Sequence, residues 1–146
     1  MRKIFLYLFG IGLLFASCDI ETSDNGLLDG YWHLVRVDTL ETGNSSDLSD
    51  TRVFWGVQMN LLQAIDHDND PGYYGYLFNF ERQDKSLRIY NPHKHERADG
   101  DPVVDEIEVI SPLGINALDN LFTINKLTKD EMILQDSFLR LWFKKM

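Results

Sequence analysis

Apolar and polar side chains alternate along most of the chain after residue 30, and this pattern constrains the fold more than any other feature. The clearest runs are 53–61, 74–81 and 138–145. The second run places four aromatic side chains on one face: Tyr74, Tyr76, Phe78 and Phe80. Because successive side chains of a strand point to opposite faces, the alternation predicts β-strands that each bury one face.

Turn-forming residues separate these runs at short intervals, as they do between hairpin-linked strands. We expect about eight strands, at 31–37, 53–62, 73–82, 86–91, 104–110, 121–127, 131–136 and 138–145. Outside the first residues, no stretch has the period of a long amphipathic helix, although 112–120 has room for one turn. Many short strands in 146 residues predict one all-β domain, either a sandwich or a closed barrel.

The first residues have the pattern of a signal peptide. Arg2 and Lys3 precede an uninterrupted apolar or glycine run, Ile4 to Phe15, which is too short to span a bilayer. Small residues follow, directly before the single cysteine of the chain, Cys18. The sequence therefore predicts a cleaved signal peptide at 1–17.

The segment Leu14-Phe15-Ala16-Ser17-Cys18 resembles the lipobox of bacterial lipoproteins. The resemblance implies that Cys18 is diacylated and becomes the new N-terminus, so that two acyl chains hold the protein firmly at a membrane. The expected organisation is an acidic tether at 18–27 and a folded domain at 28–146. We expect the protein to be an outer-membrane lipoprotein of the bacterial envelope. The domain could face either the periplasm or the cell exterior. The alternative is an ordinary secretory signal that leaves Cys18 as a free thiol.

Charge narrows the classes of partner. The chain has 14 Lys and Arg against 23 Asp and Glu, a net charge of −9. Loss of the signal peptide would leave twelve basic residues and a net charge of −11. Nucleic-acid binding requires a basic stripe, so the balance argues against it. It also predicts that anionic headgroups repel the domain.

The segment Leu28-Asp29-Gly30-Tyr31-Trp32 resembles the Gly-x-Trp opening of the lipocalin superfamily. That resemblance implies an eight-stranded, antiparallel, up-and-down barrel that binds a small apolar molecule. It further implies that Trp32 closes the barrel floor beneath a basic residue of the last strand. Arg140 is the expected residue, with Lys144 as the alternative. The layout as a whole resembles the lipocalin-like lipoproteins of Bacteroidetes, a largely uncharacterised family.

Bulky side chains of the second and third predicted strands are the candidate lining of a ligand pocket. The candidates are Trp55, Met59, Tyr74, Tyr76, Phe78 and Phe80. We expect the bulkier face to turn inward, because turned outward it would expose a continuous apolar wall. These side chains could either fill a small barrel or line a pocket inside a wider one.

Two polar segments have features of metal ligands. Asp66, Asp68 and Asp70 have the alternate spacing of calcium ligands, but Pro71 stands where a calcium loop needs glycine. His93 and His95 share one side of an extended segment, with no further ligand fixed nearby. A polar hairpin turn and a solvated loop explain these two segments better than metal ligands do, so the sequence predicts no metal and no cofactor.

The chain contains no nucleophile elbow and no phosphate-binding glycine loop, which argues against an enzyme. The leading expectation is a tethered binder of a small apolar or amphipathic molecule. The alternative is a ligand-free barrel that serves as an interaction or accessory module of an envelope complex.

Overall fold

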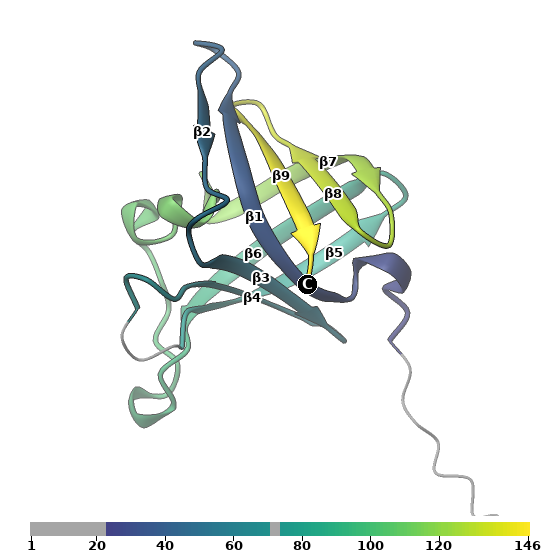
Figure 1. Cartoon of the computed structure of the whole chain (residues 1–146). Helices are drawn as coiled ribbons and strands as arrows, with labels where there is room; N and C mark the ends of the chain where they lie inside the picture. The colour runs from purple at the N-terminus through teal and green to yellow at the C-terminus, as the bar shows by residue number, and fades with distance from the viewer. Residues whose placement is uncertain (1–22, 71–73) are drawn as a thin grey trace, which may run out of the picture.

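The computed structural model describes residues 23–70 and 74–146, and Figure 1 shows their arrangement. Within these residues the chain forms nine strands: β1 (Gly30–Thr39), β2 (Ser45–Asp47), β3 (Val53–Gln58), β4 (Leu61–Asp66), β5 (Tyr76–Gln83), β6 (Ser86–Lys94), β7 (Asp119–Leu127), β8 (Glu131–Gln135) and β9 (Leu139–Lys145). They are accompanied by four short 3₁₀ helices: η1 (Gly26–Leu28), η2 (Arg97–Asp99), η3 (Ile107–Val109) and η4 (Ser111–Leu113). The predicted signal peptide and Cys18 lie outside the described residues.

Eight of the strands close into a barrel. Neighbours pair antiparallel in the order β1-β3-β4-β5-β6-β7-β8-β9, and β9 returns to pair with β1. This confirms the predicted all-β, up-and-down barrel. β2 lies outside the ring, because it pairs only with Arg36–Asp38 in the half of β1 that extends past β3 (Figure 1).

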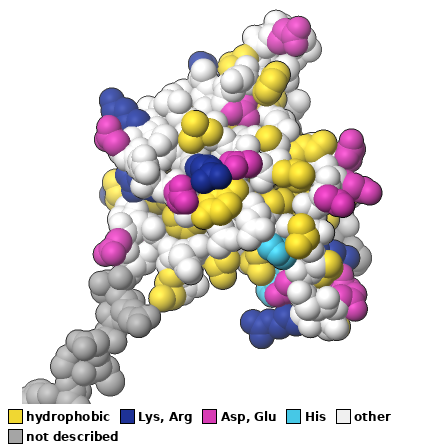
Figure 2. All heavy atoms as spheres, turned by 180° about the vertical axis from the view of Figure 1, so that it is seen from behind, with side chains coloured by type: hydrophobic (Ala, Val, Ile, Leu, Met, Phe, Trp, Pro, Cys, Tyr) yellow, Lys and Arg dark blue, Asp and Glu magenta, His cyan; other side chains and the backbone are white. Residues whose placement is uncertain are grey.

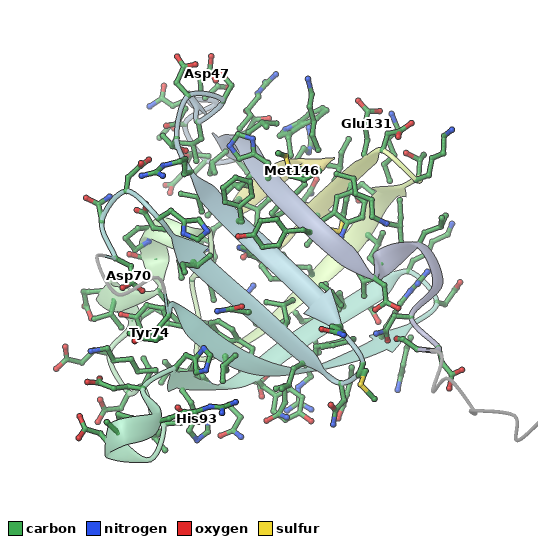
Figure 3. All side chains as sticks on the ribbon, turned by 60° about the horizontal axis from the view of Figure 1, so that its bottom comes forward. Asp47, Asp70, Tyr74, His93, Glu131 and Met146 are labelled. Atoms are coloured by element: carbon green, nitrogen blue, oxygen red, sulfur yellow. The ribbon has the colours of Figure 1, made fainter. Side chains whose placement is uncertain are left out.

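The two ends of the barrel differ. At the end that we call the floor, η1 and the start of β1 lie beside the end of β9 and the β3–β4, β5–β6 and β7–β8 turns. At the opposite end, the mouth, β6 and β7 are joined by residues 95–118, which carry η2, η3 and η4. We call 95–118 the mouth segment. Figure 3 shows Glu131 of the floor on the side opposite Asp70, Tyr74 and His93 of the mouth.

Bulky side chains fill the barrel interior. The largest fully buried ones include Trp32, Trp55, Phe78, Phe122, Leu34, Leu62, Leu87 and Ile89. The Trp55 ring lies 4.9 Å from that of Phe143 and 5.9 Å from that of Phe122, between ring centroids. Val53, Trp55 and Val57 all point inward, which confirms that the bulkier face of this strand forms the core.

The predicted strand at 53–62 is in fact two strands joined by a tight turn at Met59 and Asn60. The turn reverses which positions point inward, because Leu62 and Ala64 are buried after it while Met59 and Leu61 are exposed. Met59 adopts a left-handed conformation, with φ of +55°. Two-residue hairpin turns usually contain Asn-Gly or a similar pair, so Met-Asn gave no turn signal.

The predicted strand at 104–110 is wrong. These residues belong to the mouth segment and include η3, in which the Ile110 N–H donates to the Ile107 carbonyl oxygen at 3.1 Å. β7 covers the edge of β6 only over Ser86–Tyr90, and at the mouth a single bridge joins Val103 to His93. The Val104 N–H donates to the Pro92 carbonyl oxygen at 2.9 Å. Beyond Val104 the segment turns away from β6 into η3, so the pairing does not extend into a strand.

Candidate functional site

Trp32 is fully buried at the floor, as the sequence predicted. Its Nε1 donates a hydrogen bond to the carbonyl oxygen of Leu28 in η1, at 2.8 Å. The Nζ of Lys145 lies 4.9 Å from the centre of its ring and also contacts the Leu27 carbonyl oxygen at 3.3 Å. The indole of Trp32 is therefore covered by both η1 and the end of β9, which close the floor of the barrel.

The cation over Trp32 is Lys145, and the prediction of Arg140 or Lys144 was wrong. Arg140 lies opposite Asp38, toward the mouth, and its Nε donates to Gln135 Oε1 at 2.9 Å. Lys144 points outward and is exposed. The alternation itself could have found Lys145, because Leu141 and Phe143 are buried and the next position of the same parity is 145.

The six candidate pocket residues do not surround one cavity. Trp55 and Phe78 are fully buried and fill the interior, and Tyr76 and Phe80 are half-buried beside it. Met59 and Tyr74 have 49% and 57% of their surfaces exposed. Met59 lies in the floor turn, and Tyr74 precedes β5 at the mouth. In this conformation the barrel interior is a packed core.

The mouth segment closes the other end of the barrel. Ile110, Leu113 and Ile115 are buried in the same core as the strand residues. Trp55 Nε1 donates to the Leu113 carbonyl oxygen at 2.9 Å, which ties the segment to the barrel wall. Sequence reasoning missed this plug, since it expected a strand at 104–110 and only a single helical turn after it.

Gly114 allows the mouth segment to pack this closely. Its φ is +86°, and a Cβ added there would lie 3.0 and 3.1 Å from the two methyl groups of Leu141. A left-handed conformation is unfavourable for a residue with a Cβ atom. Glycine is therefore required for both the backbone conformation and the contact with β9.

We expect Gly114→Ala to destabilise the protein by about 1–2 kcal/mol through backbone strain, with a further loss from the Leu141 contact. Hydrogen exchange should accelerate first in the mouth segment. Gly100→Ala is the matched control, because Gly100 has φ of +74° but no atom within 4 Å of its added Cβ. Equal exchange in the two variants would contradict a role of the Leu141 contact in holding the plug.

A cleft of about 300 Å³ lies at the mouth, between the mouth segment and the barrel wall. Val109, Pro112 and Leu113 form an apolar side. The other side is polar and consists of Asp66, Asn69, Asp70, Tyr76 and Lys94. The cleft thus combines an apolar surface with hydrogen-bonding groups, as small-molecule sites do.

Lys94 is the cation of this cleft. Its Nζ lies 2.9 Å from a carboxylate oxygen of Glu96. The hydrogen bond and the charge of Glu96 raise the pKa of Lys94 above its usual value. Lys94 is therefore a fixed positive charge at neutral pH.

Two shallow hollows lie outside the barrel, near the floor. One, of about 830 Å³, is lined by Tyr31, Met59 and Leu61, among others. The second, of about 520 Å³, is lined in part by Met59 and Phe80. Met59 therefore lies on the surface of the floor, whereas Phe80 packs against the core and reaches only the edge of the second hollow.

The three aspartates with calcium-like spacing have separate partners. Asp66 Oδ1 accepts the Asp68 N–H at 3.0 Å, Asp68 binds the Arg52 guanidinium at 2.7 Å, and Asp70 accepts the Gly75 N–H at 2.6 Å. The hydrogen bonds from Arg52 lower the pKa of Asp68 below its usual value. The carboxylates thus organise the 66–70 turn.

The two histidines also bind different neighbours. His93 Nδ1 lies 2.8 Å from the Asn91 carbonyl oxygen, and His95 Nδ1 lies 3.2 Å from that of Tyr74. Among residues 23–70 and 74–146, no group of three or more His, Cys, Asp or Glu side chains is arranged to hold a metal ion.

Comparison with known families agrees with the barrel. The profile of the lipocalin-like domain family matches residues 13–146. This chain belongs to that lipocalin-like family. A search among curated proteins found no match.

Two solved structures resemble this lipocalin-like protein. A lipocalin-like protein from Bacteroides uniformis superposes with a TM-score of 0.63 at 18% identity, covering 83% of this chain and all of that one. An uncharacterized protein from Bacteroides eggerthii superposes with a TM-score of 0.58 at 17% identity, covering 81% of this chain and 98% of that one. At such identities the likeness establishes the shared fold.

No helix in the described part of this lipocalin-like protein is long and apolar enough to cross a membrane.

Proposed function

We propose that this protein is an envelope-tethered lipocalin-like domain that binds a small amphipathic molecule in the mouth cleft. The observation that carries the proposal is the two-sided lining of the cleft. The mouth segment supplies apolar contact through Val109, Pro112 and Leu113, and the barrel wall supplies hydrogen-bonding groups such as Tyr76 and Lys94. A ligand with an apolar and a polar end fits that division.

The packed core supports the mouth cleft over an interior site. Trp55 and Phe78 are fully buried, and the mouth segment adds Ile110 and Ile115 to the same cluster. A ligand inside the barrel would first have to displace the mouth segment. The cleft at its edge is already open to solvent.

Titration with the amphipathic dye 1-anilinonaphthalene-8-sulfonate tests the proposal, with amide chemical-shift changes mapping where the dye binds. We expect the shifts to centre on residues 109–113 and on β5 and β6 at the mouth. Val109→Glu should weaken binding about tenfold or more, because a charge replaces part of the apolar side, and tenfold corresponds to about 1.4 kcal/mol.

Leu121→Glu is the matched control. Leu121 is 63% exposed on the outer wall, whereas Val109 is 38% exposed in the cleft. An equal loss of binding in both variants, or shifts confined to the outer wall, would overturn the proposed cleft.

The tether part of the proposal rests on the N-terminal sequence. The basic start, the short apolar run and the small residues before Cys18 support diacylation of Cys18 and attachment to the outer membrane of a bacterial envelope. Metabolic labelling with a fatty-acid probe tests it. Label should enter the wild-type protein and be absent from Cys18→Ala; label that persists in the variant would contradict the tether.

One observation favours the second candidate, a ligand-free interaction module. A hollow of about 830 Å³ lies on the outer wall, where Tyr31, Met59 and Leu61 are exposed. A partner protein bound there would leave the mouth cleft unused. Dye titration that leaves the amides of the mouth unchanged would support this candidate over the first.

A further inference from the structure

We infer that the floor of the barrel lies against a lipid bilayer surface and that the mouth points away from the membrane. The inference deepens the proposed function and rests on its tether. It is carried by the exposed side chains, the charges and the point of chain entry at the floor.

Exposed apolar side chains lie at both ends of the barrel, and five of the eleven large ones in the described residues are at the floor. We call these five the floor patch: Leu27, Tyr31, Met59, Leu61 and Met146, whose exposed fractions are 48%, 38%, 49%, 44% and 74%. Leu27 belongs to η1, Tyr31 to β1, and Met146 follows β9. Met59 and Leu61 lie at the turn between β3 and β4. A bilayer interface accommodates apolar tips flanked by polar groups.

The members of the floor patch are close neighbours. Tyr31, Met59 and Leu61 line the same hollow. The Met146 N–H donates to the Tyr31 carbonyl oxygen at 2.9 Å, and Lys145 bridges to the Leu27 carbonyl oxygen. These contacts place the residues at one end of the barrel. The Tyr31 ring itself lies along the outer wall, where it stacks on Phe54 and its hydroxyl lies 2.8 Å from His67 Nε2.

Met59 is the most informative member of the patch. It combines a φ of +55° with a half-exposed, unbranched apolar side chain. Glycine or asparagine would adopt this turn conformation with less strain. The pairing of β3 with β4 imposes this conformation, which leaves the thioether half-exposed at the floor.

The floor carries six basic and five acidic side chains, the acidic ones being Asp24, Asp29, Asp84, Asp130 and Glu131. Six of the twelve Lys and Arg in the described chain lie at the floor: Arg82, Lys85, Lys126, Lys129, Lys144 and Lys145. The floor, taken as residues 23–32, 57–62, 82–86, 126–131 and 144–146, has a net charge of +1. The remainder of the described chain has a net charge of −10.

This distribution corrects the expectation that anionic headgroups simply repel the domain. A cation on a long apolar stem can keep its charge among headgroups while its stem contacts apolar groups. The acidic remainder is repelled by the same headgroups, which favours the orientation with the floor down. Figure 2 shows acidic side chains at the edge away from the point where the described chain begins, and others on the near side.

The chain enters the fold at the floor. Asn25 Nδ2 donates to the Met59 carbonyl oxygen at 2.6 Å, and Arg82 donates to the Asn25 carbonyl oxygen at 2.8 Å. Cys18 precedes Ser23 by five residues, which span at most about 17 Å. A lipid on Cys18 would therefore keep the floor, and not the mouth, within reach of the membrane.

The single cysteine permits a direct test. The mature chain, Cys18–Met146, is labelled with ¹⁵N and coupled through its thiol to a maleimide lipid in phosphatidylethanolamine and phosphatidylglycerol nanodiscs. A gadolinium-bearing lipid then broadens the amide signals that lie near the bilayer. Because the coupling supplies the tether chemically, failure of native lipidation would not affect this result.

We expect floor amides such as Leu27, Met59 and Lys129 to relax more than about fivefold faster than mouth amides. Strands of this length separate the two ends by roughly 20 Å, and paramagnetic relaxation falls steeply with distance. Equal broadening at both ends, or stronger broadening of the mouth segment, would overturn the inference.

Charge-changing variants provide the control. The triple variant Met59→Asp, Lys129→Glu, Lys144→Glu should abolish the difference between the two ends. The mouth variant Val103→Asp, Lys94→Glu, Arg97→Glu makes matched changes and should preserve it. Retention of the difference in the floor variant, with an unchanged amide spectrum showing that it folds, would also overturn the inference. So would concentration-dependent dimerisation through the floor patch, because it would identify a second copy as the partner.

Discussion

Replacement of Trp32 by alanine should lower the free energy of unfolding by about 3–5 kcal/mol. The side chain is fully buried, and its indole N–H satisfies the Leu28 carbonyl oxygen at 2.8 Å. Alanine would leave a cavity beneath η1 and a buried acceptor without its donor. The loss should be measured by urea unfolding followed by circular dichroism.

Lys145→Met is the comparison that separates burial of Trp32 from its contact with a cation. Methionine keeps an apolar stem over the ring and removes only the charge, so the change should be about 0.5–2 kcal/mol. A loss in Lys145→Met as large as that in Trp32→Ala would contradict this division, because it would make the cation the main stabiliser of the floor.

The barrel and its floor could be predicted because both depend on local patterns. Alternation along 53–58 and 139–145 defines which side chains face the core. Gly30 and Trp32 then mark where the first strand begins. The same alternation would have selected Lys145 over Arg140, because Lys145 lies on the face of the strand that includes Leu141 and Phe143. The error came from choosing the other face of the strand.

The mouth could not be predicted in the same way. Ile110, Leu113 and Ile115 are spaced irregularly and are buried by contact with strands far away in the sequence. Their spacing matches neither the helical nor the strand period, so the sequence did not predict that this segment closes the mouth. The Met59–Asn60 turn was missed for a different reason, because its strained conformation is imposed by the pairing of β3 with β4.

The charge distribution also depends on the closed topology. Lys85, Lys129 and Lys144 lie in different parts of the sequence. They come to the same end of the barrel, the floor, only when strands β6 to β9 pair in register. Counting charges along the chain gave only the net charge of −9. Folding separates that total into a slightly basic floor and a strongly acidic remainder.

Trp55 links the barrel wall to the mouth segment, so its removal should affect both. Its ring packs against Phe122 and Phe143, and its Nε1 binds the Leu113 carbonyl oxygen at 2.9 Å. We expect Trp55→Ala to lower the free energy of unfolding by about 3–5 kcal/mol. That total includes the cost of leaving the Leu113 carbonyl oxygen without its donor. Chemical denaturation measures the total.

Trp55→Phe is the matched variant, because it retains most of the apolar volume and removes the hydrogen bond. The smaller decrease in the free energy of unfolding of Trp55→Phe would isolate the contribution of the Leu113 contact. Hydrogen exchange should show that this destabilisation is concentrated in residues 107–116.

An apolar cavity of the kind that Trp55→Ala creates stays dry and accepts small aromatic molecules. Added indole should therefore raise the melting temperature of Trp55→Ala and leave that of the wild type unchanged. A loss below about 1 kcal/mol in Trp55→Ala, well under the range for a buried tryptophan, would mean that Trp55 lines an open cavity. In that case the ligand site would lie inside the barrel and not in the cleft at its mouth.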